Sequence, residues 1–242
     1  MLMMFFNILW GLSNIIPGDA RRARWRAKYL HDFRKKYNAL RNAVGRDLKF
    51  RHVKMIKGGW NIGFIVDNKY VFKIRKKTDA IQNTDRIMRE KRITDAFADI
   101  VSLAIPNIEI VNADDYTFYR YNFMPGRNMN TFSPHQIRKN AAIWGAQIGE
   151  FIYQMHNTRP AAIDDLRATD DGDGWNHNDI CNNVIINPKT MRVVGIIDWE
   201  YAGWGKLDTE FENTVRFSKK IRNSGILNHI TGKYSDLMAK AA

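Results

Sequence analysis

The chain has 242 residues, of which 45% are hydrophobic and 26% charged, a composition that excludes a disordered protein and allows one large domain or two lobes. Its 38 Lys and Arg outnumber its 25 Asp and Glu, and the net charge of +13 favours anionic partners: phosphorylated ligands, an acidic membrane surface or nucleic acid. The single cysteine, Cys181, excludes an intramolecular disulfide, so a cytoplasmic protein is expected.

Residues 1–45 are predicted to form a basic N-terminal extension. It opens with the apolar run MLMMFFNILWGLSNIIPG, which Asn7, Ser13 and Asn14 interrupt and which no basic residue precedes. A secretory signal carries such a basic residue, and a membrane span needs about 20 largely apolar residues. Neither is therefore expected.

A helix is predicted from about Asp19 to Val44, in a stretch with twelve basic and two acidic residues between Arg21 and Arg51. Apolar residues three or four positions apart lie on one helical face: Trp25, Tyr29, Phe33, Tyr37, Leu40 and Val44. Two explanations stay open. The face packs on the rest of the domain, or the helix lies on anionic lipid at the inner face of a membrane.

A β-rich segment follows from Phe50 to Lys76, with a hairpin turn at Asp67-Asn68 that predicts three antiparallel strands. A helix is predicted from about Asp79 to Ala98, and two more strands flank a turn between Asn112 and Asp115. Five strands and one helix would form a small N-lobe over residues 46–124.

Beyond this lobe the pattern becomes helical, and the longest periodic segment runs from about Pro134 to Asn157. Two strand-like runs, at 183–186 and 193–197, flank an Asn187-Pro188 turn, and a basic helical tail follows. Residues 125–242 are therefore expected to form a mainly helical C-lobe.

Several residue types that phosphoryl transfer requires occur in these segments. Three glycines lie between two strand-like runs, where backbone N–H groups can approach phosphate oxygens: Gly58, Gly59 and Gly63. A Gly-Gly hairpin is the commoner meaning of such a run. Lys73 stands in the apolar run VFKI, and if it points inward it needs an anionic partner, for which Glu90 is suited. A solvent-facing Lys73 is the alternative.

The strongest signal is GWNHNDICNNVII at 174–186, followed after nine further residues by IIDWEYAGWG at 196–205. Asp179, in His177-Asn178-Asp179, would accept or orient the proton of a substrate hydroxyl. A nearby Asn and Asp198 would hold Mg²⁺ through oxygen ligands. Two apolar strands that each end near such side chains are typical of a metal site.

In this order the motifs resemble the choline kinase and aminoglycoside phosphotransferase family, across about Lys54 to Gly205. The resemblance rests on Lys73, Glu90, YNFMPG from Tyr121, the helix end Met155-His156, HND at 177–179, and DWEYAG at 198–203. It implies an α+β, protein-kinase-like fold of two lobes, with a five-stranded antiparallel N-lobe, a mainly helical C-lobe, and a kinase that uses ATP and Mg²⁺.

The resemblance also implies roles for the nucleotide-binding residues. Adenine would lie between the lobes and bind backbone atoms near Asn122 to Met124. Lys73 would reach the α- and β-phosphates and pair with Glu90, under the glycines already named.

For the catalytic loop, the resemblance implies that Asp179 is the catalytic base, that His177 buttresses the loop, and that Asp198 is the main Mg²⁺ ligand. The family places its metal-binding Asn five residues after the catalytic Asp, where this chain has Val184. We expect a loop one residue shorter, in which Asn183 serves instead. Failure of that expectation would leave a weak or inactive kinase.

The acceptor is less defined. Trp199, Glu200, Tyr201 and Trp204 could form an aromatic and acidic cage for a choline-like quaternary ammonium, or these aromatics could simply pack beneath the loop. A glycan or lipopolysaccharide precursor is an equal candidate, and the basic charge disfavours aminoglycosides. The alternative from another class is a non-catalytic, kinase-like adaptor that binds a membrane surface or nucleic acid. Nucleic acid is the weaker expectation as partner, and the oligomeric state is not predicted.

Overall fold

The computed structural model describes residues 11–29, 31–57, 61–75, 80–167, 172–216 and 218–241. The chain divides into two compact units. Unit 1 comprises Met1–Ile87 and Ile108–Phe123, and unit 2 comprises Met88–Asn107 and Met124–Ala242. The N-terminal extension thus belongs to unit 1, whereas Met88–Asn107, which we placed in the N-lobe, groups with unit 2.

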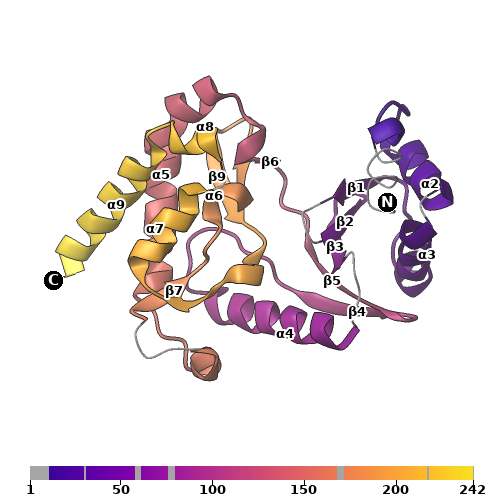
Figure 1. The fold of residues 1–242 in the computed structure, drawn as a ribbon, viewed down its shortest axis with the longest axis horizontal. Helices are drawn as coiled ribbons and strands as arrows, with labels where there is room; N and C mark the ends of the chain where they lie inside the picture. The colour runs from indigo at the N-terminus through magenta and orange to yellow at the C-terminus, as the bar shows by residue number, and fades with distance from the viewer. Residues whose placement is uncertain are drawn as a thin grey trace. The chain divides into compact units, whose positions relative to one another are not determined.

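Unit 1 contains an antiparallel sheet with the strand order β1-β2-β3-β5-β4 (Figure 1). The strands are β1 (Val53–Lys57), β2 (Asn61–Val66), β3 (Tyr70–Arg75), β4 (Glu109–Ala113) and β5 (Tyr116–Asn122). Between β2 and β3, Asp67 and Asn68 have φ of 53° and 52°, the backbone of a two-residue hairpin turn. The expected five-stranded antiparallel sheet is therefore confirmed.

Two helices, α2 (Asp19–Tyr29) and α3 (His31–Val44), stand where one long helix was expected. In α3 the predicted apolar face is buried: Tyr37, Leu40 and Val44 join a cluster with Phe64 and other residues of the sheet. Packing on the sheet therefore accounts for this face of α3. The apolar run 1–10 lies outside the described residues.

Unit 2 is mainly helical, as expected. Helix α4 (Ala80–Phe97) begins in unit 1 and continues into unit 2. The other elements of unit 2 are β6 (Arg127–Asn128), α5 (Pro134–His156), β7 (Gly174–Asn176), α6 (Ile180–Asn183), β8 (Val184–Asn187), β9 (Arg192–Ile196), β10 (Gly203–Gly205), α7 (Leu207–Arg216), α8 (Lys219–Arg222) and α9 (Ile226–Ala241), with 3-10 turns at Met129–Thr131, Ala161–Leu166 and Trp199–Tyr201. In the part of the chain described, no helix has the length and apolar character needed to cross a bilayer.

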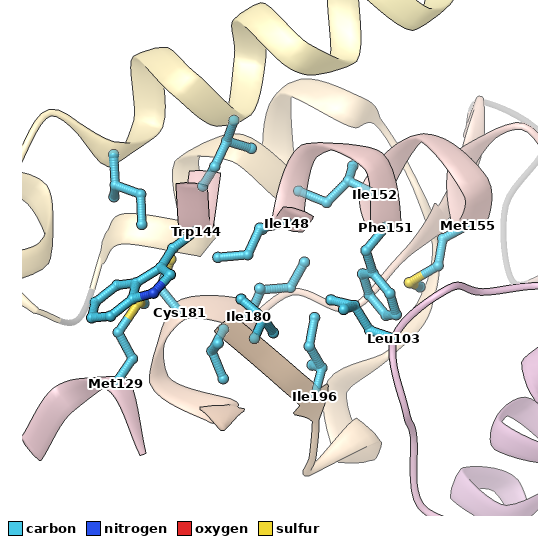
Figure 2. Packing of buried hydrophobic residues seen from close by; sticks show 14 of the residues in the cluster. Leu103, Met129, Trp144, Ile148, Phe151, Ile152, Met155, Ile180, Cys181 and Ile196 are labelled. Atoms are coloured by element: carbon cyan, nitrogen blue, oxygen red, sulfur yellow. The ribbon is translucent and has the colours of Figure 1, made fainter. Parts of the chain in front are cut away.

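Helix α5 organises the core of unit 2. Ser133 and Gln136 cap its start through reciprocal hydrogen bonds, which satisfy backbone N–H groups that the helix leaves unpaired. Figure 2 shows Ile148 and Phe151 of α5 pointing into the same apolar core as Ile180 and Ile196. Since Ile180 opens α6 and Ile196 closes β9, this core holds the two segments that carry the candidate catalytic residues.

Candidate active site

Asp179 lies immediately before α6, in the loop that follows β7. The single turn of α6 brings two asparagine side chains back onto its carboxylate. Asn182 Nδ2 donates to Asp179 Oδ1 at 2.5 Å, and Asn183 Nδ2 donates to Asp179 Oδ2 at 3.1 Å. Asn183 Nδ2 also donates to the Asp179 carbonyl at 2.9 Å. The carboxylate is therefore held in one orientation from both of its oxygens.

The β8–β9 hairpin brings Asn183 and Asp198 to the same end. Val184 pairs with Ile196, so Asn183, before β8, and Asp198, after β9, extend from the same end of the ladder. The Ile197 N–H donates to the Asn183 carbonyl at 3.1 Å, which continues the pairing by one step. Amide and carboxylate oxygens near one another suit Mg²⁺, a cation that binds oxygen ligands.

Asn182 is less suited than Asn183 to hold a metal. Its Oδ1 accepts a hydrogen bond from Asn130 Nδ2 at 2.8 Å, and its carbonyl accepts one from Asn128 Nδ2 at 2.6 Å. Because Asn182 Nδ2 donates to Asp179, both ends of the Asn182 side-chain amide are already hydrogen-bonded. For Asn183, the bonds to Asp179 use Nδ2, and Oδ1 is the atom that a cation would bind.

His177 is fully buried and connects the catalytic loop to β9. Its Nδ1 accepts a hydrogen bond from the Asp179 N–H at 3.3 Å, and its Nε2 lies 3.2 Å from the Ile197 carbonyl. An accepting Nδ1 leaves the proton on Nε2, which donates to that carbonyl, so we assign the neutral tautomer. The ring also packs edge-on against Trp199, with centroids 5.2 Å apart. The ring thus lies inside unit 2 with both nitrogens bonded to the backbone, and its role as a buttress of the loop stays a prediction.

Glu210 of α7 is a functional candidate that sequence reasoning missed. It is buried, and Oε2 accepts hydrogen bonds from the N–H groups of His177 and Asn178, while Thr214 donates to Oε1 at 3.1 Å. Burial raises its pKa to about 7, although these three donors act in the opposite direction. Its spacing with Leu207, Phe211 and Thr214 on one helical face was the signal that it points inward.

The electrostatics of Asp179 fit a proton acceptor. Burial raises the pKa of this carboxyl above its ordinary value, and the neighbouring negative charge of Asp198 raises it further. The hydrogen bonds from Asn182 and Asn183 favour the ionised form and limit the rise in pKa. A carboxylate with a raised pKa is a stronger base than an exposed one.

Asp198 has φ of 66° and ψ of 67°, a left-handed conformation that Asp tolerates better than most residues. The next residue, Trp199, donates its backbone N–H to Glu90 Oε1 of α4 at 3.1 Å. Glu90 is therefore connected with the Asp198 segment within unit 2. Lys73, its expected partner, belongs to unit 1.

Lys73 lies in the middle of β3 and is buried, which rules out the solvent-facing alternative. It pairs with Gly63 on β2 and with Tyr119 on β5, and its Nζ lies 5.2 Å from the centre of the Tyr119 ring. Gly63 is thus part of a strand rather than of the glycine loop expected. Gly58 and Gly59 fall outside the described residues.

Asn122 and Met124, the residues near which adenine is expected to bind, lie where the chain passes from unit 1 to unit 2. Asn122 is the last residue of β5 and pairs with Tyr70, and the Phe123 N–H donates to the Lys69 carbonyl at 2.8 Å. Met124 is the first residue of the second segment of unit 2. Their role toward adenine stays a prediction.

Of the two alternatives left open for the aromatic residues after Asp198, a cage or packing beneath the loop, Trp199 follows the second. Trp199 is fully buried and packs on Phe97 and Phe151, because the turn after Asp198 directs it into the core. The Trp204 ring already contacts two guanidinium groups of the chain, those of Arg159 at 4.4 Å and Arg167 at 5.0 Å.

Two other residues of the DWEYAG string remain beside the catalytic loop. Tyr201 is exposed, and its carbonyl accepts a hydrogen bond from Asn178 Nδ2 at 3.0 Å. Glu200 is half-buried. Of the three substrate residues predicted from the sequence, Trp199 is buried, whereas Glu200 and Trp204 are half-buried, and their role toward an acceptor stays a prediction.

Residues 160–224, which include the whole loop from His177 to Asp198, match the sequence model of the phosphotransferase enzyme family. Among curated proteins, no sequence matches. Among solved structures, the GDP complex of wild-type aminoglycoside 2'-phosphotransferase-IIIa is similar, with a TM-score of 0.66, 15% identity, and coverage of 83% of this chain and 82% of that one.

The streptomycin–ATP complex of APH(2")-IIa is also similar, with a TM-score of 0.57, 15% identity, and coverage of 83% of this chain and 81% of that one. Macrolide 2'-phosphotransferase MphH from Brachybacterium faecium has a TM-score of 0.57, 13% identity, and coverage of 82% of each chain. The chain therefore has the protein-kinase-like fold of the aminoglycoside and macrolide phosphotransferases, as the sequence motifs predicted.

Proposed function

We propose that this protein is a kinase that transfers the γ-phosphoryl group of ATP to a hydroxyl group of a small molecule. The observation that carries the proposal is the arrangement around Asp179: a carboxylate oriented by two amides, with Asn183 and Asp198 at one end of the β8–β9 hairpin. Phosphoryl transfer depends on positioning and charge stabilisation, and this arrangement offers both.

In this proposal Asp179 accepts or orients the proton of the acceptor hydroxyl. His177 and Glu210 hold the loop from behind, through hydrogen bonds to its backbone. The family resemblance assigns the α- and β-phosphates to Lys73, and this assignment, the pairing with Glu90 and the role of Gly58 and Gly59 remain predictions from the sequence.

Mg²⁺ fits the side chains present, because Asp198 and Asn183 offer oxygen atoms and Mg²⁺ completes its shell with phosphate and water. When bound, it neutralises the negative charge of the transferring phosphates. Adenine binding near Asn122 and Met124 completes the proposed nucleotide site.

For the acceptor, we propose a molecule that carries a cationic amine close to its hydroxyl. The chain as a whole is basic, yet residues 164–212 contain eleven acidic and four basic residues. Glu200 and Asp208 belong to this acidic stretch and follow the catalytic loop. A choline-like amino alcohol or an amino sugar suits that local charge, and the net charge of the whole chain is thus too coarse a reason to disfavour aminoglycosides. A glycan or lipopolysaccharide precursor that bears an amine fits the same proposal.

The test is ATP consumption by purified protein with Mg²⁺, across choline, ethanolamine, kanamycin, streptomycin and uncharged sugars. We expect turnover that depends on a cationic acceptor and that the Asp179→Asn variant loses. Turnover with uncharged sugars alone would contradict the proposal that the acceptor carries a cationic amine. Absence of Mg²⁺-dependent ATP binding would overturn the kinase itself and favour the adaptor alternative.

A further inference from the structure

The start of the described chain, residues 11–16, exposes two apolar side chains, Leu12 and Ile15, while it buries a polar one, Ser13. Leu12 is 51% exposed and Ile15 is 81% exposed, and they lie three residues apart at the helical turn before α2. Ser13, between them, is completely buried. This is the reverse of the pattern expected for a segment that faces only water.

Hydrogen bonds from α2 maintain this orientation. Arg26 is buried, and it donates to Ser13 Oγ at 2.5 Å and to Asn14 Oδ1 at 2.6 Å. Arg22 donates to the Asn14 carbonyl at 3.2 Å. Two arginines thus hold the polar side of the segment against α2, which leaves Leu12 and Ile15 on the outside.

Exposed basic side chains are frequent in the helices of unit 1 and in the loop after them. The exposed basic residues of the helices and of the loop after them are Arg21, Arg24, Arg34, Lys35, Arg41, Arg46, Lys49 and Arg51. In the same region only Asp19 and Asp47 are exposed and acidic among residues with described side chains, and Asp19 is bonded to Arg22 at 2.8 Å. The charge excess of the N-terminal region is therefore displayed on the surface of unit 1.

We propose that the N-terminal helical part of unit 1, with Leu12 and Ile15 as apolar anchors and its exposed arginines as the charged contribution, docks on a bilayer that contains anionic phospholipid. Leu12 and Ile15 enter the boundary between headgroups and acyl chains, and the exposed arginines bind lipid phosphates. Nucleic acid offers the phosphates but no apolar phase for the aliphatic side chains. The buried face of α3 takes no part, since it packs on the sheet.

The experiment is co-sedimentation of the full chain with phosphatidylcholine vesicles, with or without about one third of anionic phosphatidylglycerol, at low and high salt. We expect binding to the anionic vesicles only, weakened as salt rises. Equal binding to both kinds of vesicle, or to neither, would overturn the proposal.

Variants separate the apolar from the charged contribution. Leu12→Ser with Ile15→Ser should lower the partition coefficient by about tenfold or more, since both anchors are lost. Arg21→Gln with Arg24→Gln should lower it by several fold and reduce its salt dependence. As the matched control, Ile143→Ser in unit 2, also an exposed isoleucine at 42%, should leave binding unchanged.

Binding of a duplex oligonucleotide, measured in parallel, distinguishes an anionic bilayer from nucleic acid as the ligand of this surface. If the serine pair leaves vesicle binding at the wild-type level, residues 11–16 are not the anchor and the inference is wrong. The inference is also wrong if the oligonucleotide displaces the protein from vesicles and binds it equally well with and without the serine pair, because the surface is then a general polyanion site. Wild-type phosphotransferase activity of the serine pair shows that the variant is folded.

Discussion

At the scale of single residues, Asp179 is the group on which the proposed chemistry depends. Its carboxylate accepts hydrogen bonds at both oxygens, so replacement by Asn removes the negative charge and sets one amide against another. We expect Asp179→Asn to lower kcat by about a thousandfold or more and to destabilise the fold by only about 1 kcal/mol.

Single-turnover phosphoryl transfer and thermal denaturation measure these two effects. The matched control is Asp236→Asn, at an exposed position of α9, which should change neither. Retention of more than about a tenth of the wild-type rate by the Asp179→Asn protein would remove Asp179 as the base.

Glu210 makes a pH-dependent contribution to stability. Its pKa of about 7 in the folded protein exceeds the ordinary 4.5, so the folded state binds this proton more tightly than the unfolded state does. The contribution is complete below pH 4.5 and is lost as the pH rises to about 7, a difference of about 3 kcal/mol.

Glu210→Gln removes this titration and keeps an oxygen for the N–H groups of His177 and Asn178, with its amide facing Thr214. We therefore expect the variant to gain stability relative to wild type between about pH 5 and about pH 7.5. Urea denaturation of both proteins across this range measures the difference. If the free energy of unfolding depended on pH in the same way in both proteins, Glu210 would have an ordinary pKa.

At the scale of elements, the single turn of α6 carries the two asparagines whose side chains bond to Asp179. Because both ends of the Asn182 side-chain amide are hydrogen-bonded and Asn183 adjoins the Asp198 segment, the two should respond differently to truncation. Asn183→Ala is expected to raise the Mg²⁺ concentration for half-maximal activity by about tenfold or more. Asn182→Ala should mainly lower thermal stability, by about 1–3 kcal/mol. Titration of the activity of both variants with Mg²⁺ measures this difference. Equal shifts in the two variants would contradict the assignment of Asn183 as the metal-binding asparagine.

Helices α5 and α9 pack so closely that a glycine is required between them. A Cβ at Gly149 would collide with the Ile230 carbonyl oxygen of α9, whereas a Cβ at Gly232 of α9 meets nothing within 4 Å. Gly149→Ala should therefore destabilise the protein by about 1–3 kcal/mol. Gly232→Ala should stabilise it by up to about 1 kcal/mol through helix propensity. Thermal denaturation of the pair measures this, and a stabilising Gly149→Ala would show that α9 can shift.

At the scale of the whole molecule, nucleotide binding should appear as a gain in stability. A ligand at about a hundred times its Kd adds about 2.7 kcal/mol, and each kcal/mol shifts the Tm by about 2–4 °C for a chain of this size. We expect a rise of several degrees with ATP and Mg²⁺, and its loss with chelator or in Asp198→Asn. A shift of equal size in Asp198→Asn would place the metal elsewhere.

Much of the architecture could be read from the sequence because it depends on local signals. The Asp67-Asn68 turn, the alternation in the strands and the 3.6-residue period of α5 each act over a few residues. The HND and DWEYAG strings were recognisable because the types and order of their residues, together, are unusual.

Other features depend on which side chains meet across long sequence separations. Glu210 and His177 lie 33 residues apart, and nothing in either segment alone says that one supports the other. Trp199 looked like a substrate residue, yet the left-handed turn at Asp198 sends it into the core. Likewise, the inward Ser13 and outward Ile15 follow from Arg26 in a separate helix.

By itself, then, the sequence determined the fold class, the strand and helix content, the predicted phosphotransferase motifs and the uneven distribution of charge, since these follow from residue type and spacing. The tertiary structure alone decided that Asn183 adjoins the Asp198 segment, that Trp199 packs into the core, that Glu210 holds the catalytic loop, and that the start of the described chain turns Leu12 and Ile15 outward. The physical reason is that burial and hydrogen bonding between distant segments depend on three-dimensional packing, which local patterns do not encode.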